Sequence, residues 1–183
     1  MTPETNQDLE LQIPTVLAEP PEGRLPFYPY RFMGIDVGSN AIKYRVWEIV
    51  ADGSVTQIAE QRFAVRLGES VFTGGVLSEK VIDAAARAFT TIRQDVESIG
   101  VHSLRAVATS AAREAGNSLT LVHAVQRASG IRLEILPAAE EARMIALGVL
   151  GARKQLHDQY LLIDIGGGST EIIVGRRKAK RVE

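Results

Sequence analysis

The alternation of apolar and polar positions predicts three strands at the start of the folded region. An apolar run at 32–35 is typical of a buried strand, and it delivers Asp36 at its end. Looser alternation over 41–50 and 54–65 predicts two further strands. The dipeptide Asp52-Gly53 between them is a strong signal for a β-hairpin, because both residue types tolerate the backbone angles of a tight turn.

Helices then alternate with strands. Apolar residues three or four positions apart predict a helix that begins after Ser78, a capping residue, and ends at Gly100 in the left-handed conformation. We interpret 67–75, which precedes it, as a loop. The rest of the pattern predicts a strand at 104–108, a helix capped by Asn117 and stopped by Gly130, a strand at 131–135, and a helix over 138–150. This order predicts an α/β layered domain.

A second buried strand, at 161–164, also ends in an aspartate followed by a glycine turn, and one more strand follows it. The unit of strand, Asp-x-Gly turn and strand therefore occurs twice, as an internal repeat. Two strands are too few to bury a face of their own. We expect a homodimer, disorder beyond about Arg176, or pairing of these strands back onto the first sheet.

Composition narrows the function classes. Of 183 residues, 45% are hydrophobic and 23% are charged, which is typical of a globular chain with one core and part of another. A net charge of -1 gives no reason to expect a nucleic acid or membrane partner, and the absence of cysteine excludes thiol chemistry. The acidic N-terminus does not resemble a secretion signal, so we expect a cytoplasmic protein.

The same patterns divide the chain into three parts. Residues 1–29 hold most of the prolines and are predicted to be a disordered arm. Residues 30–159 are predicted to form the first folded domain, and 160–183 to begin a second domain. The basic run at 176–181 is interpreted as a solvated surface segment, although it also fits a polyanion patch.

The two Asp-x-Gly turns carry the candidate chemistry. Each places a carboxylate at a strand end and follows it with glycine and serine, whose backbone N–H groups can converge on phosphate oxygens. Alone, 38–40 also fits a hairpin turn and 166–169 a linker, but the flanking strands favour a phosphate site. The residues expected to bind phosphate are Asp36, Gly38, Ser39, Asn40, Gly166, Gly167, Gly168, Ser169 and Thr170.

Asp36 and Asp164 would repel each other and a phosphate in one site unless a cation lies between them. Mg²⁺ binds one or two carboxylates together with phosphate oxygens and water, so a divalent cation such as Mg²⁺ is expected at Asp164, with Glu171 as a second ligand. Glu171 fits a solvent-facing strand position equally well.

A hydrolase of phosphoanhydrides also needs a base. The three histidines lie away from the glycine turns, so a carboxylate of Glu140-Glu141 is the better candidate, although acidic residues at a helix start also complement the helix dipole. Arg113 follows the strand at 104–108 and can reach phosphate oxygens from the same sheet edge. It also fits an exposed arginine at a helix start.

Four motifs then stand in order: 34–40 (GIDVGSN), 108–115 (ATSAAREA), 140–143 (EEAR) and 162–171 (LIDIGGGSTE). Together they resemble the exopolyphosphatase/guanosine pentaphosphate phosphatase family, over about Arg31 to Gly175. The resemblance implies a fold of the actin, hexokinase and Hsp70 type, in which two ribonuclease-H-like domains enclose a cleft; here only the first strands of the second are expected.

By this resemblance, Glu141 is the glutamate that activates the attacking water and Arg113 is an arginine that contacts phosphate. Asp36 and Asp164 are the aspartates of the two phosphate loops, with Asp164 and Glu171 near the metal. The implied reaction, linked to the stringent response, releases terminal phosphate from polyphosphate or the 5′ γ-phosphate of guanosine pentaphosphate.

The family's second domain is expected to continue well beyond the second glycine turn. A non-catalytic polyphosphate- or nucleotide-binding module therefore remains an alternative. A sugar-kinase or chaperone relative that binds ATP is a further one, and the run Glu141-Ala142-Arg143 argues against it.

Overall fold

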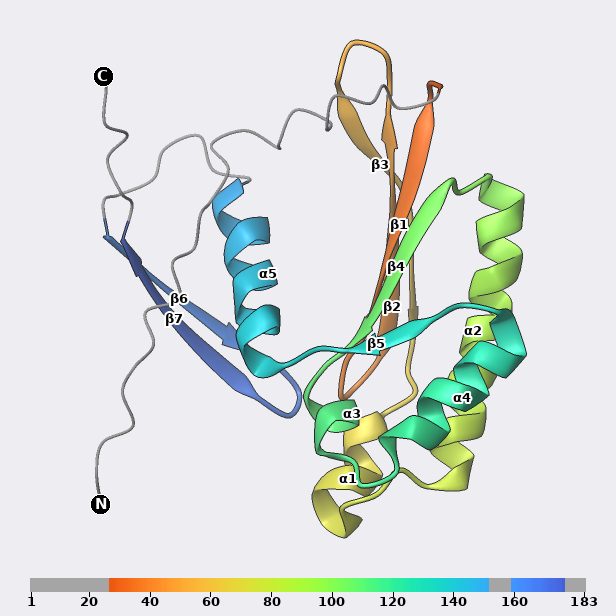
Figure 1. Ribbon diagram of the computed structural model, residues 1–183, viewed down its shortest axis with the longest axis vertical. Coiled ribbons are helices and arrows are strands. Elements are labelled where there is room, and N and C mark those ends of the chain that lie inside the picture. The colour runs from red at the N-terminus through yellow and green to blue at the C-terminus, as the bar shows by residue number, and fades with distance from the viewer. Residues whose placement is uncertain (1–26, 152–158, 177–183) are drawn as a thin grey trace.

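The computed structural model describes residues 27–151 and 159–176, which form two β-sheets and five helices (Figure 1). The strands are β1 (Tyr30–Val37), β2 (Ile42–Ile49), β3 (Val55–Phe63), β4 (Ser103–Ala108), β5 (Leu133–Ile135), β6 (Gln159–Ile165) and β7 (Thr170–Arg176). The helices are α1 (Leu67–Gly74), α2 (Glu79–Ile99), α3 (Ser110–Glu114), α4 (Ser118–Ser129) and α5 (Ala138–Gly151). The predicted arm at 1–29 lies outside the described residues apart from 27–29, as does the basic run beyond Arg176.

The larger sheet has the strand order β3-β2-β1-β4-β5. The first three strands form an antiparallel meander, whereas β1, β4 and β5 are parallel and are connected through helices. Helices α2 and α4 lie on one side of this sheet and α5 lies on the other (Figure 1). The arrangement confirms the predicted α/β fold, and the parallel strands β1 and β4 end at the same sheet edge.

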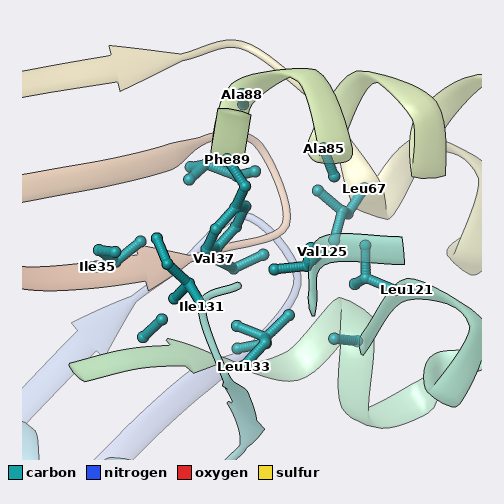
Figure 2. Packing of buried hydrophobic residues seen from close by; sticks show 14 of the residues in the cluster. Ile35, Val37, Leu67, Ala85, Ala88, Phe89, Leu121, Val125, Ile131 and Leu133 are labelled. Atoms are coloured by element: carbon teal, nitrogen blue, oxygen red, sulfur yellow. The ribbon is translucent and has the colours of Figure 1, made fainter. Parts of the chain in front are cut away.

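The main core lies between the larger sheet and helices α2 and α4. Alternate residues of β1, namely Met33, Ile35 and Val37, are buried because successive side chains of a strand point to opposite faces. Phe89 of α2 packs among them (Figure 2). Full burial of such a side chain stabilises a fold by about 1.5–3 kcal/mol. This core holds β1 in place, and with it the loop that follows β1.

The prediction of a loop over 67–75 is wrong, because Leu67–Gly74 forms helix α1. Leu67 and Val71 lie one helical turn apart and are both buried, so even a short amphipathic segment can pack on the core. Gly75, with a φ of 72°, ends the helix. The three glycines within 67–75 favour a loop in the sequence, although Leu67 and Val71 have helical spacing.

Arg66 precedes α1 in the left-handed conformation, with a φ of 58°, which is uncommon for a residue with a Cβ atom. Arg66→Gly is therefore expected to be more stable than Arg66→Ala by about 1 kcal/mol, because only glycine adopts this conformation without the Cβ penalty. Urea denaturation of the two variants measures the difference. Equal stabilities would show that Arg66 carries no backbone strain.

Most predicted helix ends are confirmed. The Ser78 side chain accepts the backbone N–H of Val81, and Gly100 closes α2 with a φ of 72°. Asn117 occupies the cap position of α4, but its side chain instead hydrogen-bonds both the N–H and the carbonyl of Leu77. Helix α3 was not predicted, because five residues are too few to show helical periodicity.

The second sheet contains only β6 and β7, which pair with each other in antiparallel register. Ile173 packs against Ala146 and Leu150 of α5, so α5 covers one face of this sheet. Pairing of these strands back onto the first sheet, one of the three predicted outcomes, is therefore wrong. Helix α5 supplies the apolar partner that the predicted two-strand unit lacked.

No helix within the described ranges is both long enough and apolar enough to cross a membrane.

Candidate functional site

A cleft of about 520 Å³ lies where the two Asp-x-Gly turns face each other. Ten of the predicted site residues line it: Asp36, Gly38, Ser39, Asn40, Glu141, Asp164, Gly166, Gly167, Ser169 and Glu171. They come from the ends of β1, β6 and β7 and from the first turn of α5. The cleft thus brings together segments that are more than 120 residues apart in the sequence.

The first loop is held by its own turn and by α1. The N–H of Gly38 donates to the carbonyl of Ala41 at 3.0 Å. The carbonyls of Ser39 and Asn40 accept N–H groups from the start of α1, at 2.8 and 3.1 Å. With these carbonyls engaged by α1, repulsion between them and an anion in the cleft is reduced.

Ser39 also forms a buried hydroxyl pair with Ser110 of α3, at 2.9 Å between the two Oγ atoms. Two hydroxyls carry two donor hydrogens, and the mutual bond uses one of them. Because both serines line the cleft, one O–H group of the pair is free to donate to a ligand. Ser110 was missed by the sequence analysis, although it lies in the predicted 108–115 motif.

The second loop joins β6 to β7, and the N–H of Gly166 donates to the carbonyl of Ser169 at 2.9 Å. Asp164 and Glu171 are partners in the antiparallel register, so their side chains emerge on the same face of the sheet. Thr170 begins β7 opposite Ile165 and does not line the cleft. Gly168 also lies off the cleft wall and packs against Phe72 and Ser39.

Glu141 is buried, with 8% of the residue exposed, and its carboxylate forms an ion pair with Arg113 at 2.8 Å. The same guanidinium nitrogen donates to the carbonyl of Leu136 at 2.9 Å. Arg113 does not itself line the cleft and is linked to it through this ion pair with Glu141. The neighbouring Glu140 pairs instead with exposed Arg143 at 2.7 Å.

Two cationic side chains on the cleft wall were missed, Lys43 of β2 and Arg62 of β3. They are register partners across the two strands, and Lys43 is also the partner of Asp36. Neither forms an ion pair among the described residues. The alternation of apolar and polar residues along each strand predicts that both side chains lie on the face of the sheet opposite the core. That they lie opposite each other depends on the register of β2 and β3, which the sequence does not show.

Four carboxylates and two cationic side chains line the cleft: Asp36, Glu141, Asp164 and Glu171 against Lys43 and Arg62. Arg113 compensates the charge of Glu141, and the remaining negative excess still opposes an anionic ligand unless a cation is bound as well. No group of three or more side chains suited to hold a metal occurs in the described part of the chain. Two carboxylates are nevertheless enough for Mg²⁺ when water and phosphate oxygens complete its shell.

The crowding of carboxylates affects Asp36. Burial among the cleft walls raises the pKa of Asp36 above its ordinary value of 3.8, and the charges of Glu141 and Asp164 raise it further, whereas Lys43 opposes them. Part of the side chain still faces solvent, so screening limits the effect. A raised pKa means that ionised Asp36 destabilises the folded chain at neutral pH, and that this cost disappears below the ordinary pKa.

Asp36→Asn is therefore expected to raise Tm at pH 7, by at most about 3 °C, with the gain shrinking towards zero near pH 3. Thermal unfolding at both pH values measures this. Asp52→Asn, in an exposed turn, serves as control and should leave Tm almost unchanged, because the amide oxygen can still accept the N–H of Ser54. A lower Tm for Asp36→Asn at pH 7 would contradict the electrostatic account.

A comparison with known sequences decides the family. Residues 46–183 match the sequence profile of the Ppx/GppA phosphatase family. The chain belongs to this family. It is 30% identical over 141 residues to an exopolyphosphatase 1 of Mycobacterium leprae, covering 77% of this chain and 42% of that protein.

A guanosine-5′-triphosphate,3′-diphosphate pyrophosphatase of Photobacterium profundum is 31% identical over 152 residues, covering 83% of this chain and 30% of that protein. The chain thus spans less than half the length of these Ppx/GppA relatives.

Solved structures of the Ppx/GppA family share the fold. An exopolyphosphatase from Cytophaga hutchinsonii aligns with a TM-score of 0.75 and 31% identity, covering 80% of this chain and 46% of that one. The Aquifex aeolicus family member aligns with a TM-score of 0.72 and 29% identity, covering 80% and 47%. These alignments confirm the predicted fold type, with only the first strands of a second sheet.

Proposed function

We propose that the cleft is the site of a phosphohydrolase that releases terminal phosphate from polyphosphate or from guanosine pentaphosphate. The observation that carries the proposal is the position of Glu141, a buried carboxylate in the same cleft as both Asp-x-Gly loops. Two relatives named for polyphosphate and guanosine phosphate chemistry support the choice of substrates.

Phosphate oxygens would be bound by the two loops. The backbone N–H groups of Ser39 and Gly167 and the free hydroxyl of the Ser39–Ser110 pair are the donors we assign to them. Lys43 and Arg62 would offset the charge of further phosphates along the wall formed by β2 and β3. These donors and charges orient the terminal phosphorus towards Glu141.

Glu141 would orient a water molecule and accept its proton as the water oxygen bonds to phosphorus and the phosphoanhydride bond breaks. The electron pair of the broken bond stays with the leaving phosphate oxygen. We assign Arg113 to positioning, because its guanidinium holds the Glu141 carboxylate at 2.8 Å and lies off the cleft wall. The resemblance implies instead that Arg113 contacts phosphate directly. The positioning role does not need that contact.

Asp164 and Glu171 would hold a divalent cation such as Mg²⁺. Their register pairing, their position on the cleft wall and their hard oxygen donors fit such an ion, and the excess of carboxylates calls for positive charge. When bound, the cation offsets the negative charge of the phosphates and of the transition state.

Phosphate release from long-chain polyphosphate and from guanosine pentaphosphate, in the presence of Mg²⁺, tests the proposal. Release above the uncatalysed background from either substrate supports it, and the ratio of the two rates identifies the preferred one.

The second candidate is a phosphate-binding module without turnover. It is favoured by the exposure of the second loop, where Gly166, Gly167 and Gly168 are all exposed, since contact with bulk solvent weakens the electrostatic stabilisation of a transition state. Saturable binding of polyphosphate without phosphate release would select this candidate.

A further inference from the structure

The two glycine loops touch each other, and the glycines of the second loop are part of that contact. None of Gly166, Gly167 and Gly168 has a φ in the left-handed region. A left-handed φ is therefore not the reason for glycine at these positions. The reason for glycine at these positions has to be close approach of neighbouring atoms.

At Gly167 and Gly168 the neighbouring atoms belong to the first loop and to α1, whereas at Gly166 they belong to Ser169 of the same loop. A Cβ atom at Gly168 would come within 2.6 Å of both Ser39 Oγ and the Phe72 ring, and one at Gly167 would meet the Asn40 side chain, with Cγ at 2.7 Å. At Gly38 the nearest atom would be 3.4 Å away, an ordinary contact. A side chain at 167 or 168 would therefore have to displace the Asn40 or Phe72 side chain from its contact, whereas one at 38 would fit without displacing a side chain.

Phe72 of α1 lies at the centre of this contact. A Cβ atom at Gly68 would also come within 2.6 Å of its ring, so one edge of the ring, at Cε2, lies against both Gly68 and Gly168. The residue is nevertheless 46% exposed and is not part of the main core. An exposed aromatic ring in contact with two backbone segments can hold them together.

The contact between the two loops opposes the electrostatic repulsion within the site. Asp36 and Asp164 precede the two loops by two residues each, and both line the cleft. Their like charges push the loops apart. Outside the loop contact, the second sheet is attached to the rest of the described residues mainly through α5 (Figure 1).

We propose that Phe72, packed on Gly168, is a positioning residue that docks the second loop on the first and so sets the spacing of the two aspartates across the cleft. The purpose of this role, which is to space the aspartates for a phosphate ligand, rests on the proposed function. The contact between Phe72 and Gly168 can be tested without ligand or turnover.

The absence of native cysteines makes the test direct. In the variant Asn40→Cys/Gly167→Cys, a thiol at position 40 replaces the amide that a Cβ atom at 167 would meet. The Cβ atoms of the two cysteines then lie near the separation of roughly 3.5–4.5 Å that a disulfide needs. Mild oxidation is expected to form an intramolecular disulfide, seen as loss of free thiols in a monomer. The control pair Asn40→Cys/Val55→Cys has its cysteines near opposite ends of β2 and β3 and should stay reduced.

Adding Phe72→Ala to the first pair is expected to slow disulfide formation about tenfold, whereas Phe72→Met, which keeps a long apolar side chain without adding a polar group at the ring tip, restores most of the rate. Val76→Ala, a truncation of another exposed apolar residue, should leave the rate unchanged. Disulfide formation no faster than in the control pair, or a rate indifferent to Phe72→Ala, would overturn the proposal.

Hydrogen exchange provides a second measurement in a chain without engineered cysteines. Phe72→Ala is expected to speed exchange of the Gly166 amide, whose N–H donates to the carbonyl of Ser169, about tenfold, with exchange in the β1 core unchanged. Unchanged exchange in the loop would also overturn the proposal. Neither readout depends on phosphate, so a failed activity assay and a failed docking contact are distinguishable.

Discussion

Glu141→Gln is expected to lower phosphate release by about 10²–10⁴-fold, because an amide cannot accept the proton of the attacking water. Glutamine has nearly the same shape, so the cleft and the two loops should keep their structure. The expected result is therefore a loss of kcat with little change in polyphosphate affinity. Steady-state phosphate release and calorimetric binding of the same preparation measure the two quantities.

Glu140→Gln is the matched control, since Glu140 is the adjacent glutamate but pairs with exposed Arg143 on the outer side of α5. It should retain the wild-type rate. A Glu141→Gln variant that keeps more than about a tenth of the wild-type rate would remove Glu141 from the role of base.

Arg113→Met is expected to lower the free energy of unfolding by about 3 kcal/mol, because it leaves the mostly buried Glu141 carboxylate without its charged partner. Only 11% of the Glu141 side chain is exposed, so water cannot replace the lost ion pair. In a Glu141→Gln background the same change should cost much less. A double-mutant cycle by urea denaturation measures this coupling.

Arg143→Met is the control for charge removal at the surface, where the ion pair with Glu140 is worth at most about 1 kcal/mol. If Arg113→Met is no more destabilising than Arg143→Met, the ion pair does not hold Glu141 in place. Any loss of phosphate release in Arg113→Met would then have to come from direct contact of Arg113 with the ligand.

Local sequence patterns were sufficient for the parts of the site that depend on a single segment. Asp36 and Asp164 were located correctly because a buried strand followed by a glycine turn is visible in a few consecutive residues. The start of α5, which carries Glu141, was found in the same way.

Contacts between distant segments could not be predicted in this way. The pairing of Arg113 with Glu141 joins α3 to α5, and α3 itself is too short to show periodicity. The placement of Lys43 beside Arg62 depends on the register of β2 and β3, which includes a bulge. No pattern along the chain encodes either relation.

The glycines illustrate the same limit. All of those in the two turns look alike in sequence, and a phosphate loop was the natural interpretation for each. The structure separates them, because Gly167 and Gly168 are confined by Asn40 and Phe72, whereas Gly38 has room for a side chain when only protein atoms are considered. What confines Gly38, on this account, is the ligand.

Binding of polyphosphate to Gly38→Ala therefore tests the central claim most directly. Gly74→Ala is the matched control, because a Cβ atom there meets open space. In calorimetric titrations with Mg²⁺, the wild type and Gly74→Ala are expected to bind polyphosphate saturably. Gly38→Ala should keep its Tm and bind at least about tenfold more weakly, because its methyl group occupies the place of a phosphate oxygen. Binding by Gly38→Ala equal to that of the wild type, or no saturable binding by the wild type, would contradict a phosphate site in this cleft.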